Sequence, residues 1–201
     1  MVFWTTMTIS SRFPNPSGQS TKQSFKARSF LPLKQNSLWK IETGVVRVMT
    51  WHEDGTLVTL GIWGPGDIVG KAFSKVEPYQ IECLTKVEAT ILPLEGWFPL
   101  TDVMLAHIQQ AEELMVIRSY KTVEIMLIKL LGWLAKKFGR EVKTGQLIDL
   151  RLTHQDIADM LNSTRVTITR ILTQLEEQGL IHRLPLHRIV LKEEELWHYE
   201  I

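Results

Sequence analysis

The hydrophobic pattern of the chain changes near residue 100, from short alternating runs to longer helical ones. Between Phe30 and Leu94, apolar residues alternate in short segments, and Asp54-Gly55 between two of them is a hairpin signal. Turns recurring about every ten residues are typical of a small all-β roll. The expected strands are residues 38–41, 45–49, 57–62 and 68–69, with later strands within 81–92.

Two helical segments follow the strands. Residues 101–119 place Met104, Ile108, Ala111 and Met115 at spacings of four, three and four, which is the a/d pattern of about two heptads. These four residues are called the α-seam below, and they pack either on the chain's own roll or on a second copy. Residues 124–138 are strongly apolar, which predicts a buried helix ended by a glycine.

Residues 152–181 have the pattern of two helices joined by a tight turn. Thr153 is expected to cap the first helix, with Asp156 reaching back to it in a capping box. Asn162 and Ser163 interrupt the helical pattern, because short polar side chains compete for backbone hydrogen bonds. Either of these two residues is able to cap the helix that follows.

The second helix of the pair, Thr164–Gln178, carries arginines between its apolar positions, and Gly179 is expected to end it. Arg165 and Arg170 lie about one turn apart and share an outward face. An arginine fork can bond guanine edges or phosphates in a DNA major groove. The pattern alone also fits an ordinary helical hairpin with solvated arginines.

The segment QDIADMLNSTRVTITRILTQLEEQGLI resembles the helix-turn-helix of the cyclic-AMP receptor protein/FNR family of transcription regulators. Within that family, STRVTITR is most similar to the NtcA nitrogen regulators. SLWKIETGVVRV, EDGT and GPGDIVG fit, in order, the glycines of the family's β-roll sensor. The resemblance implies an α+β fold: an abbreviated double-stranded β-roll of the jelly-roll, cyclic-nucleotide-binding-like type, a long dimerisation helix and a C-terminal winged helix-turn-helix.

The expected organisation is a flexible arm over 1–28, the sensor-like roll over 29–100, the dimerisation helix over 101–122 and the winged helix-turn-helix over 123–201. The arm is rich in polar residues and contains no acid. It is an ordinary tail, with Met7 as an alternative start, or a basic arm that touches DNA phosphates. Its basic residues are Arg12, Lys22, Lys26 and Arg28.

The resemblance implies DNA contacts at the start of the helix pair, in its turn, along the second helix and in a wing hairpin around residues 181–191. It also implies a homodimer joined through the α-seam, a palindromic site on double-stranded DNA and contact with RNA polymerase. The residues expected to contact DNA are Thr153, Gln155, Ser163, Thr164, Arg165, Val166, Thr167, Thr169, Arg170, Arg183, His187 and Arg188.

The similarity to NtcA regulators implies half-sites resembling GTA and TAC separated by about eight bases. In this arrangement Arg170 contacts the guanine, and Arg165 contacts a phosphate or a base edge. Val166 stands where the cyclic-AMP receptor has Glu, and it cannot accept a hydrogen bond from cytosine.

The effector cassette of the family is altered. Cyclic-nucleotide binders of the family hold the ribose and phosphate with a Gly-Glu pair and a downstream Arg-Ser. Here Gly70 is followed by Lys71, and residues 73–81 contain no Arg. A buried phosphate needs such donors to offset its charge. Cyclic AMP is therefore not expected to bind, nor is the NtcA effector 2-oxoglutarate, and Gly70 and Lys71 are the only effector-site candidates. No cofactor is predicted.

Composition limits the remaining functional classes. With 44% hydrophobic residues, 22% charged residues and a net charge of +1, the chain has the balance of a globular protein and is no uniformly basic coat for DNA. A single cysteine, Cys83, cannot supply a disulfide framework or an FNR-type iron–sulfur cluster. No apolar run reaches the length of a membrane span and no signal-peptide core is present, so a cytoplasmic location is expected.

An enzymatic role is not expected. A cupin-type roll enzyme needs several histidines and a carboxylate around a metal, whereas the roll contains one histidine, His52, beside Glu53. No metal site is therefore predicted. The chain is interpreted as a DNA-binding transcription regulator. The alternative is the same fold with the roll acting as a protein-interaction adaptor rather than as a small-ligand sensor.

Overall fold

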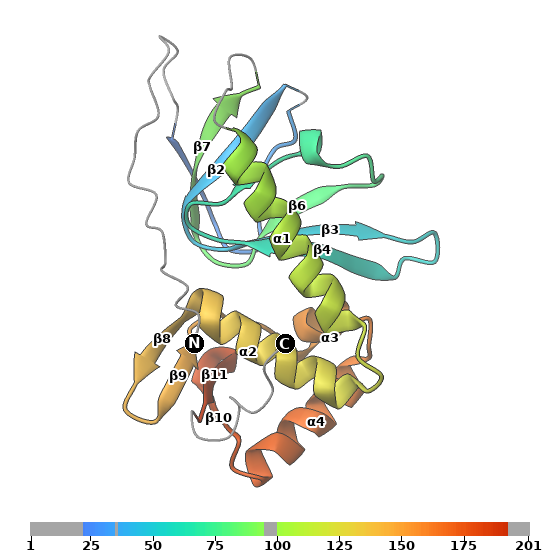
Figure 1. Ribbon diagram of the computed structural model, residues 1–201, viewed down its shortest axis with the longest axis vertical. Coiled ribbons are helices and arrows are strands. Elements are labelled where there is room, and N and C mark those ends of the chain that lie inside the picture. The colour runs from blue at the N-terminus through green and yellow to red at the C-terminus, as the bar shows by residue number, and fades with distance from the viewer. Residues whose placement is uncertain (1–21, 35, 95–99, 193–201) are drawn as a thin grey trace.

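Two antiparallel sheets share one apolar core and form the β-roll in the first half of the chain (Figure 1). The computed structural model describes residues 22–34, 36–94 and 100–192. The strand order is β1-β7-β2-β5 in one sheet and β4-β3-β6 in the other. The elements are β1 Lys22–Phe25, β2 Ser37–Thr43, β3 Val46–Trp51, β4 Leu57–Trp63, β5 Ile68–Val69, the 3-10 turn η1 Lys71–Phe73, β6 Gln80–Cys83 and β7 Val87–Pro93.

The strands form where apolar alternation predicts them, because one face of each strand faces the roll core. Trp39 and Ile41 of β2 and Val46 and Val48 of β3 are buried in that core. The predicted hairpin joins β3 to β4. At its turn the Thr56 N–H donates to Asp54 Oδ1 over 2.8 Å and the intervening Gly55 has a φ of +83°, a conformation that glycine adopts at little cost.

The prediction that residues 1–28 form a flexible arm is wrong for the last part of that range. Residues 22–25 form β1, which pairs with β7, and the Phe25 ring packs edge-on against Trp39 with 5.3 Å between centroids. Pairing of β1 covers an edge of β7 that would otherwise be open. A four-residue strand with one apolar side chain is too short to show alternation, so the sequence pattern did not reveal it. Residues 1–21 lie outside the described residues.

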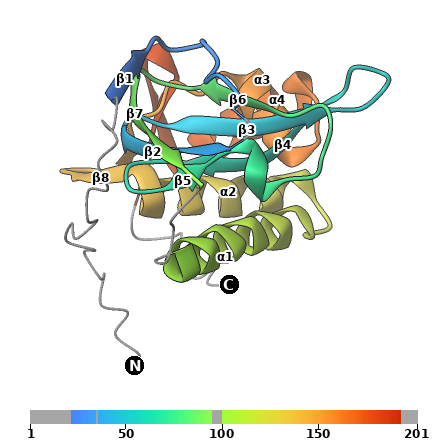
Figure 2. The ribbon, with the colours of Figure 1, turned by 90° about the horizontal axis from the view of Figure 1, so that it is seen from above.

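One long helix leads from the roll to the second half of the molecule. α1 (Leu100–Arg118) runs along one side of the roll and ends beside the helical unit, as Figures 1 and 2 show. Its buried face includes Leu114 and Ile117. α2 (Val123–Phe138) follows after a short turn, is capped by Thr122 and ends at the predicted Gly139.

The helical unit packs α2 and two further helices against a small sheet with the strand order β10-β11-β9-β8. β8 was not predicted, since it begins at Gly139, directly where α2 ends. Gly145 has a φ of +134°, and a Cβ there would lie 1.9 Å from the Leu191 carbonyl oxygen, so only glycine fits this turn. The elements are β8 Gly139–Val142, β9 Gly145–Ile148, α3 His154–Leu161, α4 Arg165–Glu177, β10 Ile181–Leu184, the 3-10 turn η2 Pro185–His187 and β11 Arg188–Leu191.

The core of the helical unit continues into the roll. Val45 and Ile62 of the roll belong to the same buried cluster as the apolar faces of α1, α2, α3 and α4. Because the roll and the helical unit share this apolar contact, they pack against each other and are not separate domains joined only by a linker. None of the helices within the described residues is long and apolar enough to cross a membrane.

We predict that Phe25→Ala will lower the free energy of unfolding by about 1–3 kcal/mol, less than the loss for a fully buried phenylalanine, because it removes the edge-on contact with Trp39. Denaturant unfolding monitored by tryptophan fluorescence measures the change. Ser24→Ala, an exposed neighbour in β1, is the control. An unchanged stability of the Phe25 variant would mean that β1 is a loose arm after all.

Candidate nucleic-acid interface

α3 begins with the capping box that the sequence predicts. The Thr153 hydroxyl accepts a hydrogen bond from the Asp156 N–H over 3.1 Å, and Asp156 Oδ2 accepts one from the Thr153 N–H over 2.8 Å. These bonds satisfy two backbone donors that a helix start leaves unpaired. The first turn of α3 is thereby fixed.

The turn between α3 and α4 differs in detail from the prediction. Asn162 ends α3 in the left-handed conformation, with a φ of 50°. Thr164 caps α4, since its hydroxyl accepts from the Thr167 N–H over 3.1 Å. Ser163 therefore caps neither helix. Asparagine tolerates the left-handed region better than most residues, which explains its role as a terminator here.

The far end of α4 closes as predicted at Gly179, which has a φ of +76°. The Leu180 N–H donates to the Leu175 carbonyl and the Gly179 N–H donates to the Glu176 carbonyl, over 3.0 and 2.9 Å. This pair of bonds is a Schellman motif. Both ends of α4 are thus held by local hydrogen bonds.

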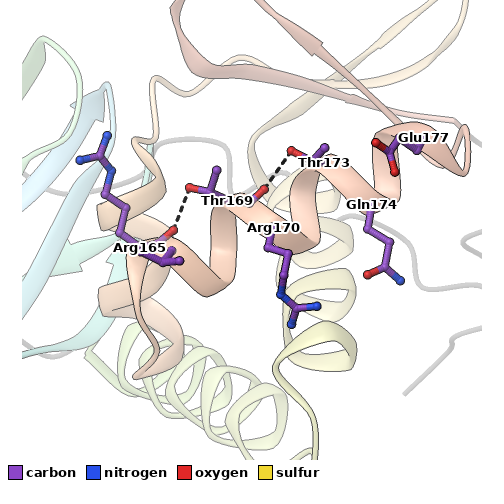
Figure 3. A pocket seen from close by; sticks show the side chains of 7 residues that line it. Arg165, Thr169, Arg170, Thr173, Gln174 and Glu177 are labelled. Atoms are coloured by element: carbon purple, nitrogen blue, oxygen red, sulfur yellow. Dashed lines mark hydrogen bonds between the residues drawn. The ribbon is translucent and has the colours of Figure 1, made fainter.

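α4 presents an exposed face on which two arginines and a valine stand (Figure 3). Val166 is 77% exposed, and Arg165 and Arg170 are also exposed. Neither guanidinium has a hydrogen-bond or salt-bridge partner among the residues that the structure describes. Side chains of α4 alone line an open hollow along this face. They are Arg165, Val166, Thr169, Arg170, Thr173, Gln174 and Glu177.

The two arginines line the same hollow, but their guanidinium groups point apart in Figure 3. They are therefore placed to reach different points of a ligand. Thr169 and Thr173 lie between and beyond them, with hydroxyls that donate to the carbonyls of Arg165 and Thr169 over 2.8 and 3.1 Å. These internal bonds occupy the threonine donors, so the cationic donors of this face, those of the two arginines, are the ones left open. Thr173, Gln174 and Glu177 were missed by sequence reasoning, although helical spacing from Arg170 points to them.

Thr153 and Gln155, also expected at DNA, lie at the start of α3 rather than on the α4 face. Thr153 is half-buried as the helix cap, and the Gln155 amide donates to Asp159 over 2.7 Å. Ser163, Thr164 and Thr167 lie at the turn before and in the first turn of α4. The turn residues therefore adjoin Arg165 along the chain, whereas Thr153 and Gln155 belong to the other helix of the pair.

The wing turn between β10 and β11 places its basic side chains unequally. Arg183 binds Glu176 through Nε and Nη2, each over 2.6 Å, so this arginine braces the wing against α4. Arg188 donates to the Pro185 carbonyl over 3.2 Å. His187 is exposed, in the left-handed region with a φ of 59°. Among the three predicted wing residues, His187 is thus the most open.

His154, which sequence reasoning did not select, joins the wing to α4. Its ring lies 6.1 Å from the His187 ring, and its Nδ1 is 2.7 Å from the Thr169 hydroxyl. Burial, followed by the charges of His187, Arg183 and Arg165, lowers the pKa of His154 below its ordinary value. A neutral imidazole at neutral pH is therefore part of this basic surface. Its position at the first residue of α3 carries no sequence signal.

The effector-site candidates are engaged within the chain. The Lys71 ammonium donates to the carbonyls of Ser74 and Val76 over 3.0 and 2.7 Å and pairs with Glu77 over 2.8 Å. The buried Tyr79 hydroxyl donates to the Gly70 carbonyl over 3.1 Å. Burial raises the pKa of Tyr79, which therefore stays a neutral donor.

The histidine considered for a cupin-type site is exposed at the β3–β4 turn, next to Glu53. Within the described ranges, no group of three or more His, Cys, Asp or Glu side chains is placed to hold a metal ion. The free thiol of Cys83 is buried, and burial raises its pKa to about 11.

Comparison with known proteins agrees with this geometry. Residues 127–199 match the Crp-like helix-turn-helix domain. The regulatory protein CysR of Synechococcus elongatus is 41% identical over 159 residues, which are 78% of this chain and 77% of CysR. The global nitrogen regulator of Nostoc sp. is 28% identical over 149 residues, which are 74% of this chain and 60% of that protein.

Solved structures show the same fold. The regulator TTHB099 of Thermus thermophilus superposes with a TM-score of 0.72 at 23% identity, over 85% of this chain and 92% of that one. FixK2 of Bradyrhizobium japonicum superposes with a TM-score of 0.76 at 20% identity, over 90% and 98%. The predicted roll, long helix and winged helix-turn-helix are confirmed, and relatives of this kind are regulators rather than enzymes. The chain belongs to the cyclic-AMP receptor protein/FNR family of DNA-binding transcription regulators.

Proposed function

We propose that the protein acts as a homodimer that places α4 of each protomer in the major groove of one half of a palindromic promoter site. The observation that carries this proposal is the exposed α4 face, on which two arginines lack partners among the described residues. A helix held at both ends presents these side chains in a defined orientation, as base reading requires. RNA polymerase is the further partner expected of a regulator of this family.

The bases read follow from the chemistry of three positions. The Arg170 guanidinium donates two hydrogen bonds, to the O6 and N7 of a guanine. Arg165 contacts a phosphate or another base edge. Val166 makes apolar contact, for example with a thymine methyl. This set agrees with half-sites resembling GTA and TAC separated by about eight bases. The wing adds backbone contact through His187, while Arg183 holds the wing in place.

Dimerisation through the α-seam is supported by its exposure. Met104, Ile108 and Met115 are 47%, 51% and 69% exposed, whereas a different face of α1 packs on the rest of the chain. Leu105 and Val116 extend the exposed apolar strip. Such a strip on one helix is typical of a surface that another helix covers. A two-fold dimer supplies the symmetry that a palindrome needs.

Regulation by cyclic AMP is not part of this proposal. The Lys71 ammonium is already bonded to carbonyls of its own loop, and the Gly70 carbonyl accepts a hydrogen bond from the buried Tyr79 hydroxyl. A nucleotide phosphate would have to displace these contacts without gaining an arginine. We place the sequence specificity of the protein in α4 and assign no effector to the roll.

Ile108→Lys is expected to convert the dimer into monomers, because it places like charges across the α-seam where apolar surface is otherwise buried. Analytical ultracentrifugation and binding to a duplex with both half-sites measure the effect. Ala106→Lys adds the same charge on the same helix, away from the seam, and serves as the control. A wild-type protein that sediments as a monomer at micromolar concentration and still binds DNA tightly would contradict the dimer.

Arg170→Ala is expected to cost about 1–3 kcal/mol of DNA-binding free energy and to relax the preference at the guanine. Selection from a random DNA pool, followed by affinity measurements on single-base variants, tests this. Arg140→Ala removes an exposed cation of the same unit away from α4 and is the control. A uniform loss on all sequences with a smaller salt slope would instead assign Arg170 to a phosphate.

Calorimetric titration with cyclic AMP is expected to give no saturable heat, because no arginine is present to offset the phosphate charge in residues 73–81. The same titration repeated in the presence of the selected DNA site checks whether DNA binding uncovers a site. A micromolar dissociation constant together with tighter DNA binding would show that the roll is a cyclic-nucleotide sensor.

A further inference from the structure

Charged side chains from the roll and from α3 meet at the boundary between the two halves of the molecule. We call this group the boundary cluster. Three of its members come from the roll and two from the first helix of the helix-turn-helix, and the contacts are hydrogen bonds and ion pairs. The members are Arg28, Arg47, Glu82, Asp156 and Asp159.

Arg28 joins the roll to α3 through both arms of its guanidinium. Its Nη1 and Nη2 donate to Asp156 Oδ1 and Oδ2 over 2.9 and 2.7 Å, and Nη1 also lies 3.2 Å from Glu82 Oε1. The Arg28 Nη2 additionally reaches the Arg151 carbonyl over 3.3 Å. Such a two-armed contact with a carboxylate fixes direction as well as distance. Arg28 itself has a φ of 66°, a left-handed conformation that costs energy in a non-glycine residue.

Arg47 completes the boundary cluster from inside the roll. It is only 4% exposed, and its Nε and Nη2 donate to Glu82 Oε2 over 3.1 and 2.6 Å. Its Nη1 donates to Asp159 over 3.3 Å, and its Nη2 lies 3.5 Å from Asp156. One buried arginine thus contacts both carboxylates of α3 and one of the roll.

The carboxylate at the centre of the boundary cluster is held in its charged form. Burial alone would raise the pKa of Asp156, but hydrogen bonds from Arg28 and Thr153 and the charge of Arg28 keep this pKa below its ordinary value. The other end of α3 is held by a third arginine, since Arg118 of α1 donates through Nε to the Met160 carbonyl over 2.7 Å. α3 is therefore anchored at both ends.

We expect the boundary cluster to fix the orientation of α3 on the roll rather than to add to the stability of the fold. Buried ion pairs add little net stability, because desolvation offsets most of their attraction. Apolar contact between the roll and the helical unit, through Val45 and Ile62, is non-directional and permits small rotations. Paired guanidinium and carboxylate groups have one arrangement that satisfies all of their donors and acceptors. The boundary cluster therefore selects one orientation of α3 on the roll, and α4 follows through the capped turn.

We propose that Arg28, together with Arg47, is a positioning residue for DNA recognition: by holding Asp156 and Asp159, the roll sets the angle at which α4 is presented. In a dimer joined through α1, this angle decides how far apart and in what phase the two copies of α4 stand. The boundary cluster thereby determines the spacing between half-sites that the protein accepts. This inference rests on the proposed dimer and palindrome.

The test compares wild type and Arg28→Ala on a series of duplexes in which the spacer between the selected half-sites is shortened or lengthened one base pair at a time, and on a duplex with one half-site. Wild type is expected to prefer one spacer. Arg28→Ala is expected to lose roughly tenfold or more on that spacer, because avidity requires both helices to engage together. It is expected to bind the single half-site within about twofold of wild type, since α4 is untouched.

Two further variants make the comparison specific. Lys22→Ala removes an ion pair within the roll, to Glu88 over 2.6 Å, and should leave the spacer profile unchanged. Asp159→Asn removes the negative charge that pairs with Arg47 without touching the capping box, and it should broaden the profile as Arg28→Ala does. A sharp, unshifted spacer profile for both Arg28→Ala and Asp159→Asn would overturn the proposal, and so would tighter binding of either variant to the preferred spacer.

A measurement without DNA separates this inference from the proposed function. A spin label on Gln178→Cys, an exposed position at the end of α4, reports the distance between the two recognition units of a dimer, and the native Cys83 is buried. The distance distribution should be narrow in the otherwise native chain and broad after Arg28→Ala. An unchanged distribution would refute the role of Arg28. Absence of any spacer preference in wild type would refute the palindrome, with the label still testing the boundary cluster.

Discussion

The apolar face of α2 is the contact on which the arrangement of the molecule depends. Leu127, Leu130, Leu131 and Leu134 are at most 1% exposed, and they pack toward α1, α3, α4 and the small sheet. Burial of these four leucines contributes several kcal/mol, at roughly 1.5–3 kcal/mol for each fully buried side chain. α2 contacts α1, which carries the α-seam, and it also contacts α4, so this one helix connects the two. The Trp133 indole N–H, which donates to Glu113 of α1 over 2.7 Å, gives this contact a direction.

The same packing divides α4 into a buried face and an exposed face. Ile168, Ile171, Leu172 and Leu175 are buried, so the opposite face is left to residues that the core does not need. On that face the hydroxyl groups bond backbone carbonyls and the guanidinium groups stay open. A helix with its apolar side fixed and both ends capped loses little further entropy when its arginines bind, which favours selective rather than merely electrostatic association.

Local pattern predicted the parts of the fold that local forces decide. Alternation located β2, β3 and β4, and apolar spacing located α1, α2 and α4. The local pattern missed β1, which pairs with β7 at the other end of the roll's sequence. It also missed β8, which begins at the glycine that ends α2. At the candidate interface, helical spacing placed the arginines of α4 on one face, and the family resemblance assigned that face to DNA. The engagement of Arg183 by Glu176, and the meeting of Arg28 with Asp156 across 128 residues of sequence, depend on tertiary contacts that no local pattern encodes.

Asp156 has two structural roles at once, and this limits which substitutions the sequence tolerates at the boundary. The same carboxylate caps α3, through bonds to Thr153, and receives the guanidinium of Arg28. A substitution at Asp156 alters helix start and domain contact together, whereas a substitution at Arg28 alters the contact alone. The strength of the contact between the roll and α3 is therefore able to change through substitutions at Arg28, but not through substitutions at Asp156. On the proposed palindromic site, variation in half-site spacing among descendants of such a chain should trace to Arg28, while Asp156 stays fixed.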